Sequence, residues 1–549
     1  MPSKRAPLAA LLAATLAACA STPAPRPVAP TAGAIVAVPT ISHPDGETAA
    51  WWFRDGAAQA AERGAMDGGA RNLILFVGDG MSLPTVAATR ILDGQRKGRP
   101  GEGNRLAWET WPQTALSKTY NTDTQTPDSA GTMSAMATGV KTRAGVISIG
   151  QSARRGDCAG ALDAHALTLW ELAEAAGLAT GVVTTARATH ATPAATFAHA
   201  ADRNWENDGQ LPAAAKAAGC TDIARQMIET PYGNGPDVLL GGGRSNFLPA
   251  GTADPEYPDR QGRRQDGRNL VDAWLARHPG GAYAWNAEQF AAAPVDAPLL
   301  GLFEPSHMQY EHDRAGDAAG EPSLAEMTRA AIERLSRDPD GYVLLVEGAR
   351  IDHAHHDGNA FRALGDTIAM SEAVAVADAM TSADDTLVLV TADHAHTMSF
   401  VGYPVRGNPI LGLVREENGD GKVEVATDDN GLPYTTLVYA NGPGYAGAEG
   451  RPDLTAVDTA GPDYLQEAIV PLGAESHGGD DVGIWARGPG SGAVRGSVEQ
   501  NAIFHLLLQA SPRLRRAMCE RDYCDANGIP VMLPDPRAFR TVSPAPATR

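Results

Sequence analysis

The feature that most constrains the fold of this 549-residue chain is a series of short apolar runs, each bounded by polar or turn-forming residues. The runs are 73–77, 181–185, 238–240, 342–346 and 387–391. Segments with helical spacing, such as 167–176 and 360–379, lie between them. Short continuous apolar runs are typical of buried parallel strands, and their alternation with helical segments predicts an α/β fold. We therefore expect a doubly wound, mainly parallel sheet flanked by helices.

Most of these runs are followed at once by acidic residues, histidine or threonine. In an open α/β sheet the carboxyl ends of the strands lie along one edge, where ligands bind. The residues expected at this edge are Asp79, Arg187, His190, Thr192, Glu347, Asp352, His353, His355, His356, Asp393, His394 and His396. His477 precedes a later apolar run, 481–486, and would reach the same edge if that strand runs antiparallel.

Nitrogen and oxygen donors gathered in this way predict a metal site. A single histidine is more often a surface or core residue than a metal ligand. Here, however, several histidines occur next to carboxylates in the sequence, and chance does not explain that pattern well. Histidine and carboxylate ligands without thiolates suit Zn²⁺, and the additional carboxylates suit Mg²⁺.

A candidate nucleophile lies in residues 127–139, PDSAGTMSAMATG, which begin with a turn and continue with small, helix-compatible residues. Ser129 would lie near the helix N-terminus, where free N–H groups and the helix dipole favour an anion. The alternative is that Ser129 is only the N-cap of this helix, and the segment alone does not exclude it.

The charge balance limits the class of partner. Lys and Arg number 45 against 65 Asp and Glu, a formal net charge of −20. Because such a surface repels a phosphate backbone, we expect no nucleic-acid binding. An anionic substrate would need local positive charge from arginine or metal.

The N-terminus is predicted to be an export signal. Lys4 and Arg5 precede an apolar run of signal-peptide length that ends LAAC at Cys19. This ending resembles the lipobox of bacterial lipoproteins, which implies cleavage after residue 18 and a lipid on Cys19; a simple secretory signal is the alternative. The protein would then be anchored in the bacterial envelope, at the outer membrane, in the periplasm or at the cell surface, and would touch the membrane only through that lipid. Residues 19–48 are expected to be a Pro/Ala-rich linker and 536–549 a disordered tail.

Four cysteines remain beside Cys19, and an even number in an exported chain suggests two disulfides. Cys519 and Cys524 are close enough in sequence to close a local loop, which leaves Cys158 with Cys220. Free buried thiols are the alternative.

Six segments resemble alkaline phosphatases and occur in that family's order. They are LILFVGDGM (73–81), PDSAGTMSAMATGVKT (127–142), VVTTARATHATPAATFAHAADRNW (182–205), VEGARIDHAHHDGNAFRA (346–363), VTADHAHTMSFVGY (390–403) and ESHGGDDVGIWARGP (475–489). The resemblance is greater to the animal-type branch than to the enteric bacterial type. It implies a catalytic domain over 49–535 with a small β-rich surface insert, the crown, at about 406–453.

The resemblance also implies roles for individual residues. Ser129 would be the nucleophile that becomes phosphoserine, and Arg203 would clamp the phosphate. One zinc ion would be held by Asp352, His356 and His477, a second by Asp79, Asp393 and His394, and magnesium by Asp79, Thr192 and Glu347. His190 and His353 stand where the enteric type has Asp and Lys, so they would alter magnesium affinity and phosphate retention.

Further expectations follow from the same resemblance. A structural calcium site would use the carboxylates of Glu256, Glu304 and Glu321 and the backbone carbonyl of Phe303, with Asp317 as a substitute for Glu321; oxygen-only ligands suit Ca²⁺. Solvated acidic loops are the alternative. The cysteine pairs 158/220 and 519/524 match disulfides of the animal-type family. A homodimer is implied, with an N-terminal arm near Trp51 that embraces the partner.

Together these patterns predict a metal-dependent phosphate-monoester hydrolase, an alkaline phosphatase, that acts on small-molecule phosphate monoesters through a phosphoserine, with two zinc ions and one magnesium ion. One alternative is a phosphodiesterase of the same superfamily. Another, from a different class, is a catalytically silent lipoprotein that binds metal or phosphate.

Overall fold

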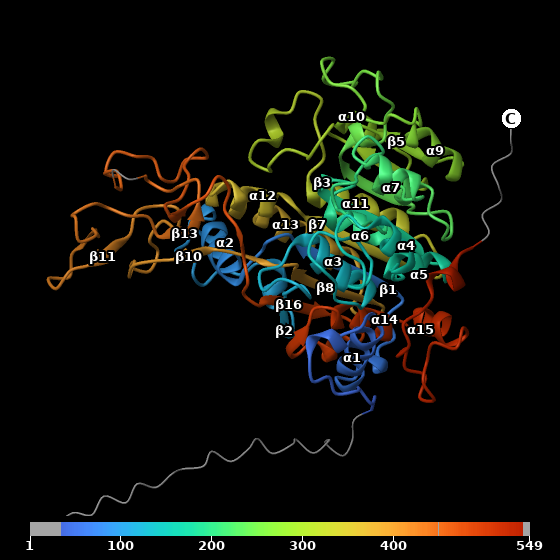
Figure 1. Ribbon diagram of the computed structural model, residues 1–549. Coiled ribbons are helices and arrows are strands. Elements are labelled where there is room, and N and C mark those ends of the chain that lie inside the picture. The colour runs from blue at the N-terminus through green and yellow to red at the C-terminus, as the bar shows by residue number, and fades with distance from the viewer. Residues whose placement is uncertain (1–34, 448–449, 542–549) are drawn as a thin grey trace, which may run out of the picture.

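The computed structural model describes residues 35–447 and 450–541, and its centre is a ten-stranded sheet (Figure 1). The strand order is β17-β2-β16-β8-β1-β7-β3-β4-β6-β5. β16 runs antiparallel to β2 and β8, and the other pairings are parallel. The bounds are β1 Asn72–Gly78, β2 Gln113–Lys118, β3 Ala179–Arg187, β4 Val238–Gly242, β5 Ala282–Ala284, β6 Leu299–Leu302, β7 Tyr342–Gly348, β8 Thr386–Ala392, β16 Val482–Arg487 and β17 Gly496–Glu499. The predicted mainly parallel sheet is confirmed.

The strands predicted from apolar runs lie side by side as β8, β1, β7, β3 and β4. Each contains a continuous apolar run because both faces of the sheet are covered. In β1, Leu73 and Leu75 contribute to one core, while Ile74 and Phe76 contribute to the core on the opposite face. The strands that the analysis missed, β2, β17, β6 and β5, lie at the two edges of the sheet.

Helices cover both faces of the sheet (Figure 1). α11 and α13 pack with Ile74 on one face, and α3, α5, α6 and α14 pack with Leu75 on the other. The bounds are α1 Ala49–Glu62, α2 Leu83–Arg96, α3 Ser129–Thr138, α4 Cys158–Asp163, α5 Leu169–Ala175, α6 Ala191–Phe197, α7 Ala213–Ala217, α8 Ile223–Ile228, α9 Leu270–Arg277, α10 Ala287–Ala292, α11 Leu324–Leu335, α12 Arg350–His356, α13 Ala360–Met380, α14 Ala502–Ala510 and α15 Pro512–Cys519. Among the described residues, no helix combines the length and the apolar character needed to cross a membrane.

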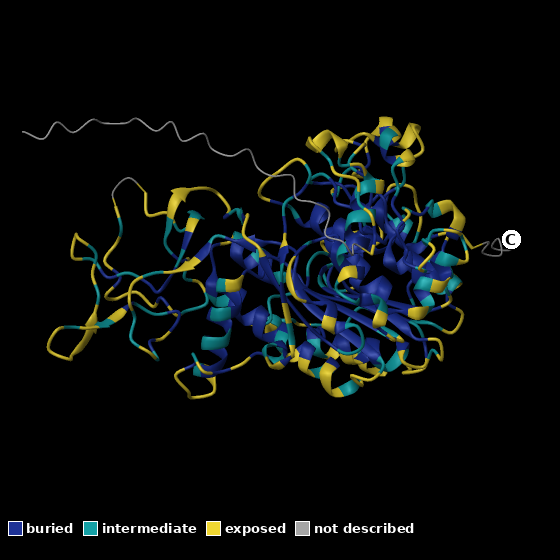
Figure 2. Ribbon diagram, turned by 90° about the horizontal axis from the view of Figure 1, so that it is seen from below, coloured by how far each residue is buried: buried dark blue, intermediate teal, exposed yellow. Residues whose placement is uncertain are grey.

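A small β-rich lobe, residues 398–471, extends from the body and carries much of its exposed chain (Figures 1 and 2). Its strands are β10 Met398–Phe400, β11 Arg415–Glu417, β12 Val423–Val425, β13 Leu437–Gly442 and β14 Ala468–Pro471. Leu437 and Tyr439 pack with Ala88 of α2 and Leu364 of α13, which fixes the base of the lobe to the body. The expected β-rich insert is therefore present, and its sheet begins before residue 406 and ends after 453.

At both ends of the described chain, residues outside the predicted bounds of the folded domain are packed against it. Val36, within the predicted linker, is buried with Ala57 of α1 and Val531. Phe539, within the predicted tail, is buried in the main core, and the Thr541 N–H donates to the Pro231 carbonyl. The folded part therefore extends to Thr541, because an apolar side chain beyond residue 535 has a place in the core. The predicted signal peptide, Cys19 and residues 542–549 lie outside the described residues.

The predicted arm contributes to the core of its own chain. Trp52 and Phe53 of α1 are 2% and 0% exposed, and the Phe53 ring lies 5.7 Å from that of Phe504 in α14. Only Trp51 of this aromatic run is half-buried. Trp52 and Phe53 therefore serve intrachain packing.

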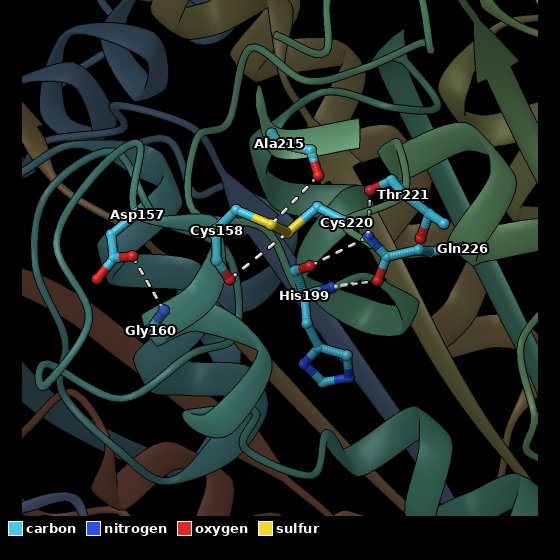
Figure 3. Close-up of a disulfide and its surroundings, with 8 residues drawn as sticks. All are labelled: Asp157, Cys158, Gly160, His199, Ala215, Cys220, Thr221 and Gln226. Atoms are coloured by element: carbon cyan, nitrogen blue, oxygen red, sulfur yellow. Dashed lines mark hydrogen bonds between the residues drawn. A yellow bond between two sulfur atoms is a disulfide. The ribbon is translucent and has the colours of Figure 1, made fainter. Parts of the chain in front are cut away.

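Both predicted disulfides are present. Cys158, the first residue of α4, bonds to Cys220, just after α7, and Cys519 bonds to Cys524. Figure 3 shows the first disulfide close to Gln226, whose amide nitrogen donates to the carbonyls of His199 and Thr221. The alternative of free thiols is wrong for these four cysteines.

Candidate active site

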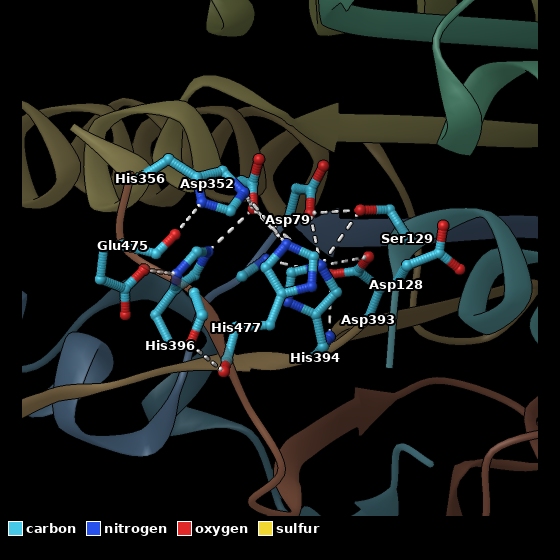
Figure 4. Close-up of polar contacts among 12 residues, drawn as sticks. Asp79, Asp128, Ser129, Asp352, His356, Asp393, His394, His396, Glu475 and His477 are labelled. Atoms are coloured by element: carbon cyan, nitrogen blue, oxygen red, sulfur yellow. Dashed lines mark hydrogen bonds and ion pairs between the residues drawn. The ribbon is translucent and has the colours of Figure 1, made fainter. Parts of the chain in front are cut away.

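The carboxyl ends of β1 and β8 bring three predicted ligands together (Figure 4). Asp79 directly follows β1, and Asp393 and His394 directly follow β8. His394 Nε2 lies 3.3 Å from Asp79 Oδ1 and 3.3 Å from Asp393 Oδ2. The Gly80 N–H donates to Asp393 Oδ1 at 3.0 Å and fixes that carboxylate. All three side chains are fully buried.

Ser129 begins α3 and faces this group. Its Oγ lies 3.1 Å from His394 Nε2 and donates to Asp79 Oδ1 at 3.3 Å. The helix cap is the preceding residue, Asp128, whose carboxylate accepts from the Gly131 N–H at 3.1 Å. The alternative in which Ser129 is only an N-cap is therefore wrong. Its hydroxyl is directed into the cluster at the N-terminal end of a helix, where negative charge is favoured.

A second group lies beside the first and centres on Asp352 of α12. Asp352 Oδ1 lies 3.3 Å from His356 Nε2 and 3.4 Å from His477 Nε2. His477 arrives on the short strand β15 (His477–Gly478), which precedes the antiparallel strand β16, as expected. The Nδ1 atoms of these two histidines point away, toward the Glu475 and Pro127 carbonyls, so both Nε2 atoms face Asp352.

A third group has buried oxygens that lack partners. Asp79 Oδ2 and Glu347 Oε1 have no hydrogen-bond partner among the residues that the structure describes. Thr192 lies beside Glu347 without a well-formed hydrogen bond. Because an unpartnered buried carboxylate oxygen costs free energy, this set fits a hard cation with oxygen ligands, as magnesium is.

The electrostatics of the three groups also fit cations. Burial raises the pKa of Asp79 well above its usual value, and the charges of Asp352 and Asp393 raise it further. Burial raises the pKa of Glu347 to about 8. Burial would raise the pKa of Asp352 too, but His356, His396 and His477 more than offset it and hold that pKa well below its usual range. Bound cations would relieve the repulsion among these carboxylates.

Arg203 adds positive charge next to Ser129. Its Nη1 donates to Asp128 Oδ2 at 3.1 Å, and its Nη2 lies 3.1 Å from His190 Nε2. Burial lowers the pKa of Arg203, but Asp128 and Asp79 raise it more, so the guanidinium stays charged. This position suits the predicted phosphate clamp.

The structure shows contacts for two residues, His396 and Glu475, to which the sequence analysis gave no individual role. His396, on β9 (Ala395–His396), donates from one ring nitrogen toward Asp352 Oδ1 at 2.8 Å, and its other ring nitrogen contacts Glu475. Glu475 also accepts from the Thr397 N–H at 2.7 Å. His396 therefore holds Asp352 in place from behind. The spacing His394-x-His396 and the Glu before Ser476-His477 were the available signals.

The residues predicted to bind calcium also converge, away from the sheet edge. Glu256 Oε1, Asp317 Oδ2 and Glu321 Oε2 are buried without hydrogen-bond partners in the described part of the chain. Glu304 Oε1 accepts from the Tyr257 hydroxyl at 3.0 Å and the Gln309 amide at 2.8 Å, and Phe303 directly precedes it. Burial raises the pKa of Glu256 to about 7 and that of Glu321 to about 9. We call Glu256, Glu304, Asp317 and Glu321 the acidic loop cluster.

Comparisons with known proteins agree with this geometry. The family model described as alkaline phosphatase matches residues 70–512. The tissue-nonspecific alkaline phosphatase of Gallus gallus is 43% identical over 480 residues, which cover 84% of this chain and 89% of that protein. The alkaline phosphatase of Gadus morhua is 44% identical, over 80% of this chain and 92% of that protein. The crystal structure of Thermus thermophilus alkaline phosphatase is 27% identical, with a TM-score of 0.57, and the match covers 81% of this chain and 92% of that one. The chain belongs to the alkaline phosphatase family of phosphate-monoester hydrolases.

Proposed function

We propose that this chain hydrolyses phosphate monoesters in two half-reactions with Ser129 as the nucleophile. The observation that carries the proposal is the position of the Ser129 hydroxyl, 3.1 Å from His394 Nε2 and 3.3 Å from Asp79 Oδ1, with the Arg203 guanidinium held beside it through Asp128. A nucleophile, an anion-binding arginine and a buried set of N and O donors are the parts that phosphoryl transfer needs.

The donor sets support two zinc ions and one magnesium ion. Asp352, His356 and His477 would hold the first zinc ion, Asp79, Asp393 and His394 the second, and Asp79, Thr192 and Glu347 the magnesium ion. When bound, these ions supply the positive charge that a phosphate dianion and an attacking oxygen require. Asp79 is shared because its Oδ1 faces His394 while its Oδ2 is unpartnered among the described residues.

The chain's own residues perform the remaining tasks. Asp79 Oδ1 accepts a hydrogen bond from the Ser129 hydroxyl and so orients Oγ. Arg203 binds two nonbridging oxygens of the phosphoryl group with its paired N–H donors. Ser129 Oγ then forms a bond to phosphorus as the bond to the leaving oxygen breaks, and the leaving oxygen takes up a proton. In the second half-reaction a water oxygen forms a bond to the same phosphorus as the bond between phosphorus and Ser129 Oγ breaks. Ser129 Oγ takes up a proton that the water gives up, and inorganic phosphate leaves.

His190 and His353 support these residues without touching Ser129. His190 Nε2 accepts from Arg203 and so fixes the clamp, and His353 directly follows Asp352 on α12. Their replacement should change phosphate affinity and magnesium affinity rather than remove the nucleophile.

We also propose that the acidic loop cluster binds one calcium ion. Glu256, Glu304 and Glu321 would supply carboxylate oxygens and Phe303 its carbonyl, and the unpartnered oxygen of Asp317 adds Asp317 to the set. An oxygen-only donor set favours Ca²⁺ over Zn²⁺.

Export, the lipid anchor and a homodimer belong to the same proposal. Two disulfides support folding in an oxidising compartment. Cys19, in its lipobox-like context, would carry the lipid. The β-rich lobe exposes Tyr403 (89%), Ile469 (74%) and Val470 (50%), an apolar surface that a second copy of the chain would cover.

The test is turnover of p-nitrophenyl phosphate against its bis ester by protein loaded with zinc and magnesium. We expect efficient release of nitrophenol from the monoester and little from the bis ester. Preference for the bis ester would establish the phosphodiesterase alternative, and no turnover of either, with metals verified, would establish a silent binding protein.

A further inference from the structure

Next to the phosphate clamp lies a cluster of three histidines and one arginine. The proposed reaction gives two of the histidines a supporting role and gives the other histidine and the arginine none. We call His190, His307, His353 and Arg350 the rim cluster. The ring centroids are 4.1 Å apart for His307 and His353, 5.2 Å for His190 and His307, and 5.5 Å for His190 and His353. The rings are half-buried, whereas Asp79 and Ser129 are fully buried. The rim cluster is therefore more exposed than Asp79 and Ser129 and about as exposed as Arg203.

Each imidazole of the rim cluster contacts an arginine. Arg203 Nη2 lies 3.1 Å from His190 Nε2, and Arg350 Nη1 lies 3.1 Å from His353 Nδ1. The Arg187 guanidinium contacts His307 Nε2, and the Arg187 backbone N–H lies 3.3 Å from His307 Nδ1, so donors face both ring nitrogens of His307. Because a guanidinium only donates, His190 Nε2 and His353 Nδ1 must accept.

The protonation pattern of the rings follows from these contacts. A neutral imidazole has one acceptor nitrogen and one N–H donor. Since His190 Nε2 and His353 Nδ1 accept from arginines, the hydrogen lies on His190 Nδ1 and on His353 Nε2. His190 Nδ1 is buried and has no hydrogen-bond partner among the described residues. The cluster therefore presents donors that lack acceptors.

A metal ion is a poor occupant of this cluster. One nitrogen from each histidine lies within 4.8 Å of the others, a spacing that an ion could bridge. The lone pairs that an ion would need are, however, already used by arginines. Three guanidinium groups also surround the rings, and they repel a cation.

The charges of these arginines are not equally compensated. Arg187 forms two hydrogen bonds to Glu206, at 2.6 and 2.7 Å, and Arg203 pairs with Asp128. Arg350 lies over the Tyr310 ring at 3.7 Å and forms no ion pair within 4 Å of a carboxylate in the part of the chain that the structure describes. Burial raises the pKa of the nearby Asp366 to about 7, and the charge of Arg350 lowers it only in part, so Asp366 compensates Arg350 less than a direct ion pair would. Arg350 therefore keeps a positive charge beside the donors of the rim cluster.

We propose that the rim cluster is a subsite for a second anionic group of the substrate, a phosphate or a carboxylate, while Arg203 and Ser129 engage the phosphoryl group that is transferred. Arg350 supplies the charge, His353 and His190 supply the N–H donors, and His307 packs against both of their rings. The proposal rests on the proposed function and names the substrate class: phosphate compounds that carry a second anionic group near the scissile bond.

The test compares Arg350→Gln with the wild type, both loaded with metals. kcat/KM is measured for pyrophosphate and for phosphoglycolate, each relative to p-nitrophenyl phosphate, which has no second anionic group. We expect at least one of the two ratios to fall roughly tenfold, because a charge-assisted hydrogen bond is lost. A fall for pyrophosphate alone identifies a phosphate subsite, and a fall for phosphoglycolate alone identifies a carboxylate subsite.

Arg362→Gln is the matched control. Arg362 also lies near the Tyr310 ring, at 5.7 Å, but Asp313 compensates its charge at 2.8 Å. Its ratios should stay within about twofold of the wild type. Unchanged ratios in Arg350→Gln, or an equal fall in Arg362→Gln, would overturn the subsite.

A binding measurement separates this inference from the proposed function. If the wild type turns over none of the three substrates, the proposed function fails, but calorimetric affinities for methylenediphosphonate and for inorganic phosphate still test the subsite. Arg350→Gln should weaken the diphosphonate roughly tenfold more than it weakens phosphate. Equal weakening of diphosphonate and phosphate binding would overturn the subsite. So would a metal at the rim cluster, seen as one additional bound zinc ion in the wild type that is lost in His307→Gln.

Discussion

Two carboxylate clusters in this molecule are built on different principles. At the sheet edge, Asp79, Asp352 and Asp393 are interleaved with histidines, and each lies at the end of a strand or on the helix that follows it. In the acidic loop cluster, Glu256, Glu304, Asp317 and Glu321 face one another with no histidine among them. Arg244 pairs with Glu256 at 3.2 Å, and its charge offsets part of the rise that burial causes in the pKa of Glu304. The first cluster contains both nitrogen and oxygen donors, while the second offers only oxygen.

This difference indicates which of the two clusters would carry out the proposed reaction. Strands fix the first cluster in a buried sheet, and Ser129, the proposed nucleophile, and Arg203 enter it from α3 and from the segment after α6. The second cluster has buried carboxylates but no nucleophile, and loops supply its members. We therefore expect the sheet-edge cluster to control turnover and the acidic loop cluster to control stability.

The largest expected effect is the loss of activity in Ser129→Ala. Turnover of p-nitrophenyl phosphate should fall about 10³-fold or more, because the nucleophile is removed while every proposed metal ligand remains. Zinc content, measured by elemental analysis, should stay near that of the wild type. Glu304→Gln, in the other cluster, should retain turnover within about twofold. Wild-type turnover in Ser129→Ala would remove Ser129 from the reaction.

A smaller but still large effect is expected for His477→Ala. Zinc affinity should fall roughly 10²-fold, because one of three proposed ligands to the first zinc ion is lost. Added magnesium alone should not restore activity, which is measured after dialysis against a chelator and reloading. His312→Ala is the control, since His312 packs on Phe361 outside the cluster. Equal zinc contents in both variants would contradict the assignment.

Arg203→Lys should have a moderate effect. Lysine keeps the charge but loses the paired donors, so the inhibition constant for inorganic phosphate should rise about tenfold. The control is Arg225→Lys. Arg225 lies on α8, outside the proposed site, and pairs with Glu229 at 2.7 Å. An unchanged inhibition constant in Arg203→Lys would mean that Arg203 does not clamp phosphate.

The smallest effect concerns the pH dependence of stability in the acidic loop cluster. Burial raises the pKa of Glu321 to about 9, above its value of about 4.5 in the unfolded chain. Between these pH values the folded protein holds a proton that the unfolded chain has lost, so stability falls as pH rises. Calcium, which replaces that proton, should remove most of this fall.

The measurement is the melting temperature of zinc- and magnesium-loaded protein from pH 6 to pH 8.5, with and without calcium. Calcium should raise it by roughly 2–5 °C at the higher pH. Glu321→Gln should show a flatter pH dependence and a smaller calcium shift. A calcium shift that is the same in the wild type and in Glu321→Gln would exclude Glu321 from the site.

The sequence predicts the centre of the fold better than its margins. The strands β1, β3, β4, β7 and β8 contain buried apolar runs because helices cover both faces of the sheet, so these runs stand out in the sequence. β2 and β17 lie at an edge with exposed residues and give no comparable run. Phe539 could not be placed from sequence, because its burial depends on a distant core.

The same reasoning applies to the site. Residues that follow strands, such as Asp79 and Asp393, could be assigned to the sheet edge from their position alone. His396 was placed at the same edge, but its contact with Glu475 could not be predicted, because it joins residues 79 positions apart through β9 and β15. His307 was missed for a similar reason, since only the fold brings its loop beside His353.

The most direct test of the central claim is chemical trapping of the intermediate. Metal-loaded wild type is mixed with a phosphate monoester, quenched in acid and digested, and its peptides are sequenced by mass spectrometry. Our account predicts phosphate on Ser129, with none on that peptide in Ser129→Ala and an undiminished amount in Glu304→Gln. Phosphate on another residue, or steady turnover by Ser129→Ala at the wild-type rate with no phosphopeptide, would contradict the account.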